Sequence, residues 1–291
     1  MIDFRIYTFL EVCRTLNFTK AGQNLSVTQP AVSQHIRFLE EHYGYRLFDT
    51  RGKKIQLTPA GEILYHAAST MVHDEIHLQK LMEDSAHPAQ TVTFGVTMTI
   101  GEYTLSPHLS SYIREHPGTA VRVVVANTHE LLSMLSGQEI DFAIVEGYFS
   151  KSEYDSLQYS RENFIAVCSP DAPFASRSVS LEDLFSCNLI VRESGSGTRE
   201  IFEKALTERN ATVADFSNTI EINSMNAIKS LTAQNCGITF LYETAVKKEL
   251  ETGTLVRIPL RDFNISHDFT FIWTKGSIFS DYYHELFQQL K

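Results

Sequence analysis

Uncharged hydrogen-bonding side chains stand at the start of a predicted helix within residues 25–44, LSVTQPAVSQHIRFLEEHYG. Gln29, Ser33 and Arg37 recur every four residues on an outward face, while Val32 and Ile36 face inward. A helix that only covers a core has little use for such groups at its N-terminal end. A helix that enters a groove lined with donors and acceptors needs them, and the pattern favours this second kind.

A second set of polar side chains follows predicted strands in the C-terminal two-thirds of the sequence. Four stretches rich in hydroxyl and amide groups stand where a helix is expected to begin, so free N–H groups and the helix dipole favour an anion. Ligands bind beyond the carboxyl ends of strands in open α/β sheets, which gathers these stretches around one site. The candidate residues are Thr97, Met98, Thr99, Asn127, Thr128, Ser196, Gly197, Thr198, Asn223 and Ser224.

The ligand predicted for this site is a small carboxylate or inorganic anion. The SGSGT stretch at residues 194–198 is a weak signal alone, because glycine and serine also form ordinary turns and helix caps. Glu146 ends the predicted strand DFAIVEG and is a further candidate. Its carboxylate is expected to repel anions, to meet an amino group, or to be a solvated or capping side chain.

Short helices must position the first set of polar residues. Apolar residues at helical spacing predict one helix from about Phe4 to Thr15, and FTKAGQNLSVT predicts a shorter second one. Thr28 can cap the third helix, and Pro30 falls in its first turn, where a missing N–H is harmless. Two helices joined by a tight turn form a helix-turn-helix, whose second helix projects into the major groove of DNA.

A basic turn follows the third helix. After Gly44, YRLFDTRGKKIQLT places a cationic turn between two short extended runs, as in a wing that touches phosphate or the minor groove. Each polar residue alone would fit a solvated surface, but the whole arrangement indicates double-stranded DNA. The predicted DNA contacts are Thr28, Gln29, Pro30, Ser33, Gln34, Arg37, Arg51, Lys53 and Lys54.

The stretch FTKAGQNLSVTQPAVSQHIRFLEEHYGYRLFDTRGKKIQLTPAG resembles the winged helix-turn-helix of LysR-type transcriptional regulators. The run QPAVS at residues 29–33 and the run LTPAG at residues 57–61 carry much of the resemblance. The family usually has alanine where Gly22 stands and often arginine at Gln34, so one phosphate contact is expected to be weaker. The resemblance implies a sequence-specific regulator controlled by a small-molecule effector.

Charge is segregated along the chain, whose formal net charge is -10. Residues 1–60 hold eight Lys/Arg and five Asp/Glu, a net charge of +3, whereas the remainder carries -13. A basic head can meet phosphates while an acidic body is repelled by them. The bias is modest, so it supports the DNA prediction without establishing it.

One long helix is predicted from Ala60 to about Asp84. Its apolar stripe runs from Ile63 to Met82 and is too long to be buried against a small N-terminal domain alone. Dimerisation through this helix would present two recognition helices to a two-fold DNA site. His66, His73 and His77 also lie here and are expected to be solvated or inter-helix residues, because no further ligands complete a metal site.

From residue 91 onward, strands alternate with helices, which predicts parallel sheets covered by helices. The arrangement resembles the two-lobed, periplasmic-binding-protein-like effector domain of the LysR-type family. The predicted fold class is α+β overall: a winged helix-turn-helix at residues 1–59, a linker or dimerisation helix at 60–87, and an effector domain at 88–291. Lobe one comprises residues 91–161 and 266–291, and lobe two comprises 162–265. The resemblance also makes a homodimer or a homotetramer the expected assembly.

Other classes of protein fit less well. SGSGT lacks the G-K-[ST] ending of a P-loop and does not spell G-x-S-x-G, so an enzyme is not expected. A solute receptor for transport should have an export signal and no winged helix. With no long apolar run and no signal peptide, a cytoplasmic protein without membrane contact is expected. No cofactor or metal is expected, and the four widely spaced cysteines predict isolated buried thiols.

Overall fold

The structure is a computed structural model that describes residues 2–49, 55–85, 91–175 and 177–291. The chain divides into two compact units, which are described separately. Unit 1 comprises Met1–Pro88 with Thr274–Ser280, and unit 2 comprises Ala89–Trp273 with Asp281–Lys291. Within the described residues, none of the helices is long and apolar enough to cross a membrane.

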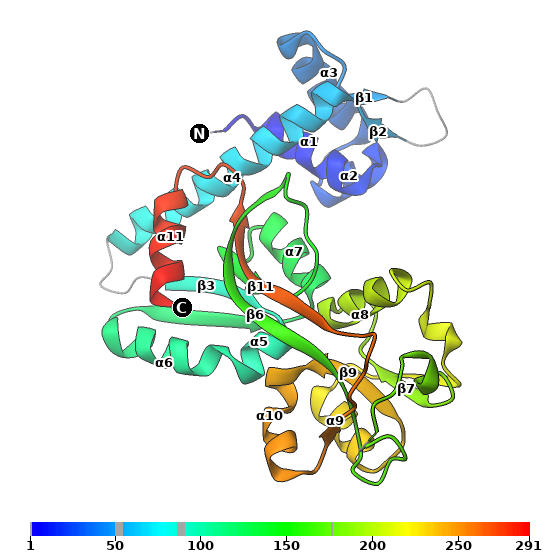
Figure 1. The fold of residues 1–291 in the computed structure, drawn as a ribbon. Coiled ribbons are helices and arrows are strands. Elements are labelled where there is room, and N and C mark those ends of the chain that lie inside the picture. The colour runs from blue at the N-terminus through cyan, green and yellow to red at the C-terminus, as the bar shows by residue number, and fades with distance from the viewer. Residues whose placement is uncertain (1, 50–54, 86–90, 176) are drawn as a thin grey trace. The chain divides into compact units, whose positions relative to one another are not determined.

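Unit 1 begins with the predicted helix-turn-helix (Figure 1). The turn between its second and third helices is tight: Ser26 has a φ of +56°, and Val27 N donates to Gly22 O at 2.9 Å. A Cβ at Gly22 would lie 2.8 Å from Val27 O, so glycine permits this close approach. The elements of the unit are α1 (Phe4–Thr15), α2 (Phe18–Asn24), α3 (Gln29–Tyr43), β1 (Phe48–Asp49), β2 (Gln56–Leu57) and α4 (Pro59–Ser85).

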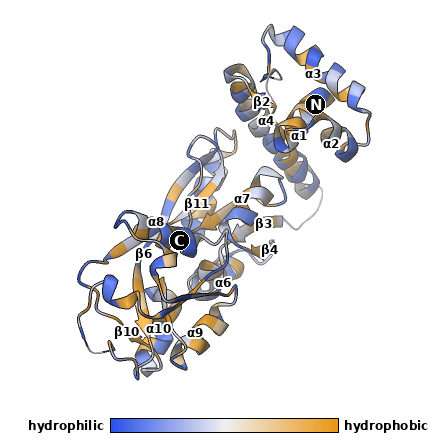
Figure 2. Ribbon diagram, turned by 90° about the vertical axis from the view of Figure 1, so that its right-hand side faces the viewer, coloured by the Kyte–Doolittle hydropathy of each residue, from blue (hydrophilic) through white to orange (hydrophobic). Residues whose placement is uncertain are grey.

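The core of unit 1 joins the helix-turn-helix to α4. Hydrophobic and hydrophilic residues alternate along α3, and its apolar side faces this core (Figure 2). Ala68 and Val72 of α4 are buried in the same cluster, so the helix predicted as a connector also belongs to the fold of the N-terminal unit. The buried side chains are Ile6, Phe9, Val12, Ala21, Val32, Ile36, Leu39, Leu47, Phe48, Ala68 and Val72.

A distant piece of chain, residues 274–280, packs on α4. The buried Asp74 carboxylate accepts from Ser277 Oγ at 2.5 Å and from Ile278 N at 3.0 Å. The ring of Phe279 lies 4.5 Å from that of His77, centroid to centroid. His73 and His77 are consequently buried, and the expectation that they might be solvated is wrong.

Unit 2 is one mixed sheet of nine strands flanked by helices. Its strands are β3 (Thr91–Val96), β4 (Ala120–Val125), β5 (Phe142–Val145), β6 (Tyr154–Cys168), β7 (Asn188–Val191), β8 (Asn218–Glu221), β9 (Ile238–Tyr242), β10 (Val256–Arg257) and β11 (Ile265–Thr274). Its helices are α5 (Met98–Tyr103), α6 (Leu105–Glu115), α7 (Thr128–Ser136), α8 (Gly197–Thr207), α9 (Met225–Ala233), α10 (Glu243–Thr252) and α11 (Ser280–Gln289), with short 3₁₀ turns at Glu182–Leu184 and Val213–Asp215.

Parallel pairing holds only toward the two ends of this sheet. The strand order is β4-β3-β5-β11-β6-β9-β7-β8, with β10 on β6, and the pairs among β3, β4 and β5 and among β7, β8 and β9 are parallel. The long strands β6 and β11 run side by side between them (Figure 1). β11 is antiparallel to β5, with Phe271 opposite Ile144, and β6 is antiparallel to β9.

The expectation of parallel sheets is therefore wrong at the centre. A parallel neighbour needs a long crossover connection, usually a helix. No helix separates β10 from β11, and β11 enters the sheet antiparallel to β5.

The thiols also differ from expectation: all four cysteines are free, but Cys236 is exposed and only Cys168 is fully buried.

Glu40 provides a test of how the third helix supports the following strand. Its side chain accepts from Leu47 N at 2.9 Å and from Arg46 Nη1 at 2.8 Å. Glu40→Ala leaves the Leu47 N–H without this acceptor and should lower the free energy of unfolding by about 1–3 kcal/mol. Urea denaturation of the full chain measures this effect. The neighbouring Glu41→Ala, at a side chain that is 72% exposed, should change it by less than about 0.5 kcal/mol, and equal losses would contradict the assignment.

Candidate functional sites

The N-terminal end of α3 presents the polar face that the sequence indicates. Gln29 Nε2 donates to Ser33 Oγ at 2.8 Å, which ties the two side chains together on an exposed surface. Thr28 is the N-cap, its hydroxyl accepting from Ala31 N at 3.4 Å, and Pro30 lies in the first turn. Both local expectations for this helix start are confirmed.

The remaining predicted contacts on α3 are exposed. Gln34 points to solvent, and the Arg37 guanidinium reaches Glu41 only at 3.8 Å, in a pair whose side chains are both largely exposed. A depression of about 560 Å³ runs beside these residues and is also lined by Arg46, which the sequence analysis did not assign. Strands β1 and β2 pair as expected for a wing. Arg51, Lys53 and Lys54 lie outside the described residues.

His35 holds this helix against its neighbour. Its Nδ1 lies 3.0 Å from Thr8 Oγ1, and its ring meets Phe4 edge-on at 4.9 Å. Val32, Ile36 and Leu39 are buried beneath. The inward side of α3 therefore packs against the core, and the polar side chains at its N-terminal end lie on the outward side.

In unit 2, the four predicted stretches do begin helices. Thr97, Asn127, Ser196 and Ser224 are the N-cap residues of α5, α7, α8 and α9. These four helix starts are confirmed, because capping depends on nearby residues alone. The candidates form two groups: Asn127 and Ser224 make a capping hydrogen bond with their side chains, whereas Thr97 and Ser196 do not.

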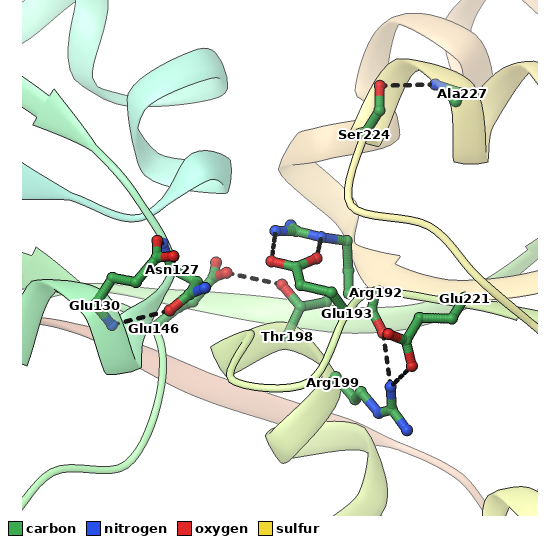
Figure 3. A network of polar contacts seen from close by, with 10 residues as sticks. All are labelled: Asn127, Glu130, Glu146, Arg192, Glu193, Thr198, Arg199, Glu221, Ser224 and Ala227. Atoms are coloured by element: carbon green, nitrogen blue, oxygen red, sulfur yellow. Dashed lines mark hydrogen bonds and ion pairs between the residues drawn. The ribbon is translucent and has the colours of Figure 1, made fainter.

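Asn127 and Ser224 use their side chains as caps. Asn127 Oδ1 accepts from Glu130 N at 2.9 Å within a complete capping box, and Ser224 Oγ accepts from Ala227 N at 3.3 Å. Asn223 and Ser224 are also exposed. Ser224 lies on a loop separate from Glu146 (Figure 3). Met98 is half-buried against the apolar cluster of lobe two. Roles of these residues in ligand binding remain predictions.

Thr97 and Ser196 stand at N-caps but make no capping hydrogen bond with their side chains. Their hydroxyl oxygens, together with those of Thr99 and Thr128, are buried and have no hydrogen-bond partner. All four residues are at most 3% exposed. Buried polar groups are almost always paired in folded proteins, so this cluster is suited to a ligand that accepts several hydrogen bonds.

Glu146 lies among these hydroxyls. Thr198 Oγ1 donates to Glu146 Oε1 at 2.7 Å, and the two side chains point toward one another in Figure 3. The other carboxyl oxygen, Oε2, is buried without a partner. Burial raises the pKa of Glu146, and hydrogen bonding from Thr198 and Thr99 with the charge of Arg192 opposes this only in part, although Thr99 makes no hydrogen bond of normal geometry. The expectation of a solvated carboxylate is wrong, since the group is only 1% exposed.

Two glycines bring the lobes into contact beside Glu146. A Cβ on Gly197 would lie 2.6 Å from Thr128 Oγ1 and 2.8 Å from Gly147 N. Across the same junction, His129 N donates to Gly195 O at 3.4 Å. Only a residue without a side chain allows the start of α8 to approach lobe one this closely.

Three residues of the site escaped the sequence analysis. Arg192 is 3% exposed and has one buried guanidinium nitrogen, Nη1, without a partner. The Tyr242 hydroxyl is also buried and unpaired, and burial followed by the charge of Glu146 raises its pKa well above the usual value. Gly147 makes the lobe contact. Of these three residues, only Arg192 could have been found from the sequence. It directly follows the apolar strand NLIV, and a charged side chain at the end of a buried strand requires a polar partner.

Two families match the chain. Residues 5–62 match the family described as bacterial regulatory helix-turn-helix protein, lysR family, and residues 85–291 match the LysR substrate binding domain. The second match alone covers more than half of the chain.

Individual proteins agree with this. CysL of Bacillus subtilis, an HTH-type transcriptional regulator, is 27% identical over 269 residues, which are 91% of this chain and 88% of that protein. Full-length LysG of Corynebacterium glutamicum with bound effector Arg is similar in fold, with a TM-score of 0.63, 16% identity and coverage of 100% and 98% of the two chains. The CcmR regulatory domain of Synechocystis in complex with 2-PG has a TM-score of 0.60 and 21% identity, covering 68% of this chain and 95% of that one. The chain thus belongs to the LysR family, whose members are DNA-binding transcriptional regulators with an effector-binding domain and are not enzymes.

Proposed function

We propose that this regulator reads its DNA site with the N-terminal end of α3 and responds to a small anion or carboxylate bound between lobe one and lobe two. The observation that carries the second part is the buried cluster of unpaired hydroxyls around Glu146. Family membership supplies the general function. The residues, the ligand class and the assembly are the specific content of the proposal.

Gln29 and Ser33 are assigned to base edges in the major groove. The hydrogen bond between Gln29 and Ser33 holds the amide and the hydroxyl together at the N-terminal end of α3. On DNA, both groups can replace this bond with hydrogen bonds to base edges. Thr28, Pro30, Gln34 and Arg37 border the same surface and are assigned to positioning contacts with phosphates. Arg51, Lys53 and Lys54 are assigned to the wing on their sequence alone.

These two kinds of contact can be separated by mutation. Gln29→Ala and Ser33→Ala should each reduce the preference for the cognate promoter over random duplex by about 1–3 kcal/mol, because base contacts carry the discrimination. Lys53→Ala should weaken binding to both duplexes similarly and lower the salt slope by about one, because it removes a phosphate contact. Mobility-shift titrations at several salt concentrations measure both effects. Unchanged promoter binding by the α3 variants would show that the contacts are assigned wrongly.

The apolar surface of unit 1 fits a second copy of this chain. A groove of about 870 Å³ runs between the end of α3 and α4 and is lined by Tyr45, Ile63 and Met71, all of them exposed. Ile63 is 73% exposed and Met71 60%, which is unusual for apolar residues that lie on one stripe. A partner α4 would cover them, giving a homodimer with two α3 helices, or a tetramer of such dimers.

The assembly is tested with Ile63→Glu combined with Met71→Glu. Two charges in the groove should shift the protein toward monomers in sedimentation velocity, since an unpaired charge is costly at an apolar interface. Val27→Glu, a change at an exposed apolar residue outside the groove, serves as the control and should leave the assembly as in the wild type. An unchanged distribution for the double variant would rule out this face as the interface.

The effector acts through a difference in affinity between two arrangements of the lobes, since a ligand shifts an equilibrium only by that difference. In the described arrangement the hydroxyls of Thr97 and Thr128, from lobe one, and of Ser196, from lobe two, are all buried, and Thr128 and Ser196 line one pocket. An anion that binds all three would favour this closed arrangement. CcmR with 2-PG and LysG with Arg indicate that related domains take small charged molecules.

Thermal-shift measurements with carboxylates, amino acids and inorganic anions test the ligand class. At least one anion should raise the melting temperature of the wild type, and Ser196→Ala should weaken its binding by roughly tenfold or more, because a hydrogen bond to a charged group is lost. Ser230→Ala, at an exposed serine on α9, is the matched control. A wild-type protein that no anion stabilises would end the proposal for this site.

A further inference from the structure

Glu146 poses a problem for an anion site, because an ionised carboxylate would repel the ligand. We infer that the effector is an oxyanion that binds together with one proton, held between a ligand oxygen and Glu146 Oε2. The inference rests on the proposed effector site and specifies its chemistry. It makes Glu146 a hydrogen-bond donor to the ligand rather than a repelling charge.

The hydrogen bonding of the carboxyl group supports this arrangement. Oε1 already accepts from Thr198 Oγ1 at 2.7 Å, while Oε2 is buried and unpaired among hydroxyls that are unpaired themselves. A proton on Oε2 turns it into an O–H donor, of the same kind as the hydroxyls of Thr97, Thr128 and Ser196. All of these groups can then donate to one acceptor-rich ligand.

The charges facing Glu146 offset the effect of its burial only in part. Among the described residues, those that act on it are Arg192 and Glu193, and both lie just after β7. Glu193 binds the Arg192 guanidinium through two hydrogen bonds, from Nε at 2.8 Å and from Nη2 at 2.9 Å, which balances most of that positive charge. From β9, the Tyr242 hydroxyl is neutral because its pKa is raised well above the usual value. Complete burial is the largest influence on Glu146 and favours its neutral form.

An ammonium ligand is the alternative, since it would pair with an ionised Glu146. The surrounding groups favour the oxyanion. Thr128 and Ser196 mark the starts of α7 and α8, each at least nine residues long, where backbone N–H groups and the dipole attract negative charge. Their buried hydroxyls without partners are a second, independent observation that points to a ligand able to accept hydrogen bonds.

The number of protons taken up with the anion depends on whether Glu146 is ionised in the free protein. Where Glu146 is ionised in the free protein, binding of one anion takes one proton from solvent and forms a neutral carboxyl hydrogen-bonded to the anion. Affinity therefore falls as pH rises through the pKa of Glu146 in the free protein, by up to about tenfold per pH unit. Below that pKa the proton is already present, and affinity is independent of pH.

The test uses the full-length protein and inorganic sulfate, which carries no titrating proton between about pH 5 and about pH 9. Calorimetric titration in buffers of different ionisation enthalpy should show sulfate binding with uptake of up to one proton at the upper end of this range. Glu146→Gln keeps a donor without a titrating charge, so its sulfate affinity should be independent of pH. Glu102→Gln, at an exposed carboxylate on α5, should behave as wild type.

Infrared difference spectra of wild type against Glu146→Gln supply a measurement that needs no ligand. They should contain the C=O stretch of a protonated carboxyl below the free-protein pKa of Glu146. Absence of that band at the lower end of the pH range would overturn the inference. No binding of sulfate or phosphate would also overturn it, as would binding of L-serine that Glu146→Gln abolishes. Where the band disappears as pH rises, Glu146 is ionised in the free protein, and sulfate binding at that pH without proton uptake would leave the effector site in place and remove only the role of Glu146. The same holds for sulfate affinity that has the same pH dependence in both proteins across the pH at which the band disappears.

Discussion

The approach of Gly197 to Gly147 is the contact on which the proposed effector site depends. It brings the start of α8 against the residues that follow β5, so that Thr198 reaches Glu146. Any side chain at Gly197 would collide with Thr128 Oγ1 or with backbone atoms. The burial of five polar atoms around this contact costs free energy unless something binds them.

The same strands that form the site continue toward the linker helix. β5 ends at Val145, directly before Glu146, and is paired with β11 in the register that sets Thr270 opposite Val145. β11 leads into residues 274–280, where Asp74 of α4 holds Ser277 and Ile278. The chain thus runs without interruption from the strand paired with β5 into the segment that Asp74 holds. Such a route carries regulation only if the ligand favours one arrangement over another.

In unit 1 the division between core and binding surface is clear. Val32 and Ile36 fix α3 against its neighbours, and His35 adds a hydrogen bond to Thr8. Gln29 and Ser33 then lie on the opposite, exposed side, with their positions supported by their own hydrogen bond. Exposed Ile63 and Met71 mark a different surface, whose apolar character suits protein rather than DNA.

Local features could be predicted from the sequence because they depend on neighbouring residues. The bounds of α1, the cap at Thr28 and the helix starts at Asn127 and Ser224 all follow from helical spacing and capping chemistry. The polar N-terminal end of α3 could be predicted for the same reason, since it lies on one helix.

Only the tertiary structure decided which polar groups are buried together. Glu146 and Ser196 are 50 residues apart in the chain, and their burial depends on how the lobes meet. His77 is buried against Phe279 of the returning segment 274–280, and β11 enters antiparallel to β5 after a connection from β10 that contains no helix. These features arise from contacts between residues that are distant in the sequence. The spacing and types of residues within one segment do not determine which distant segment will pack against that segment.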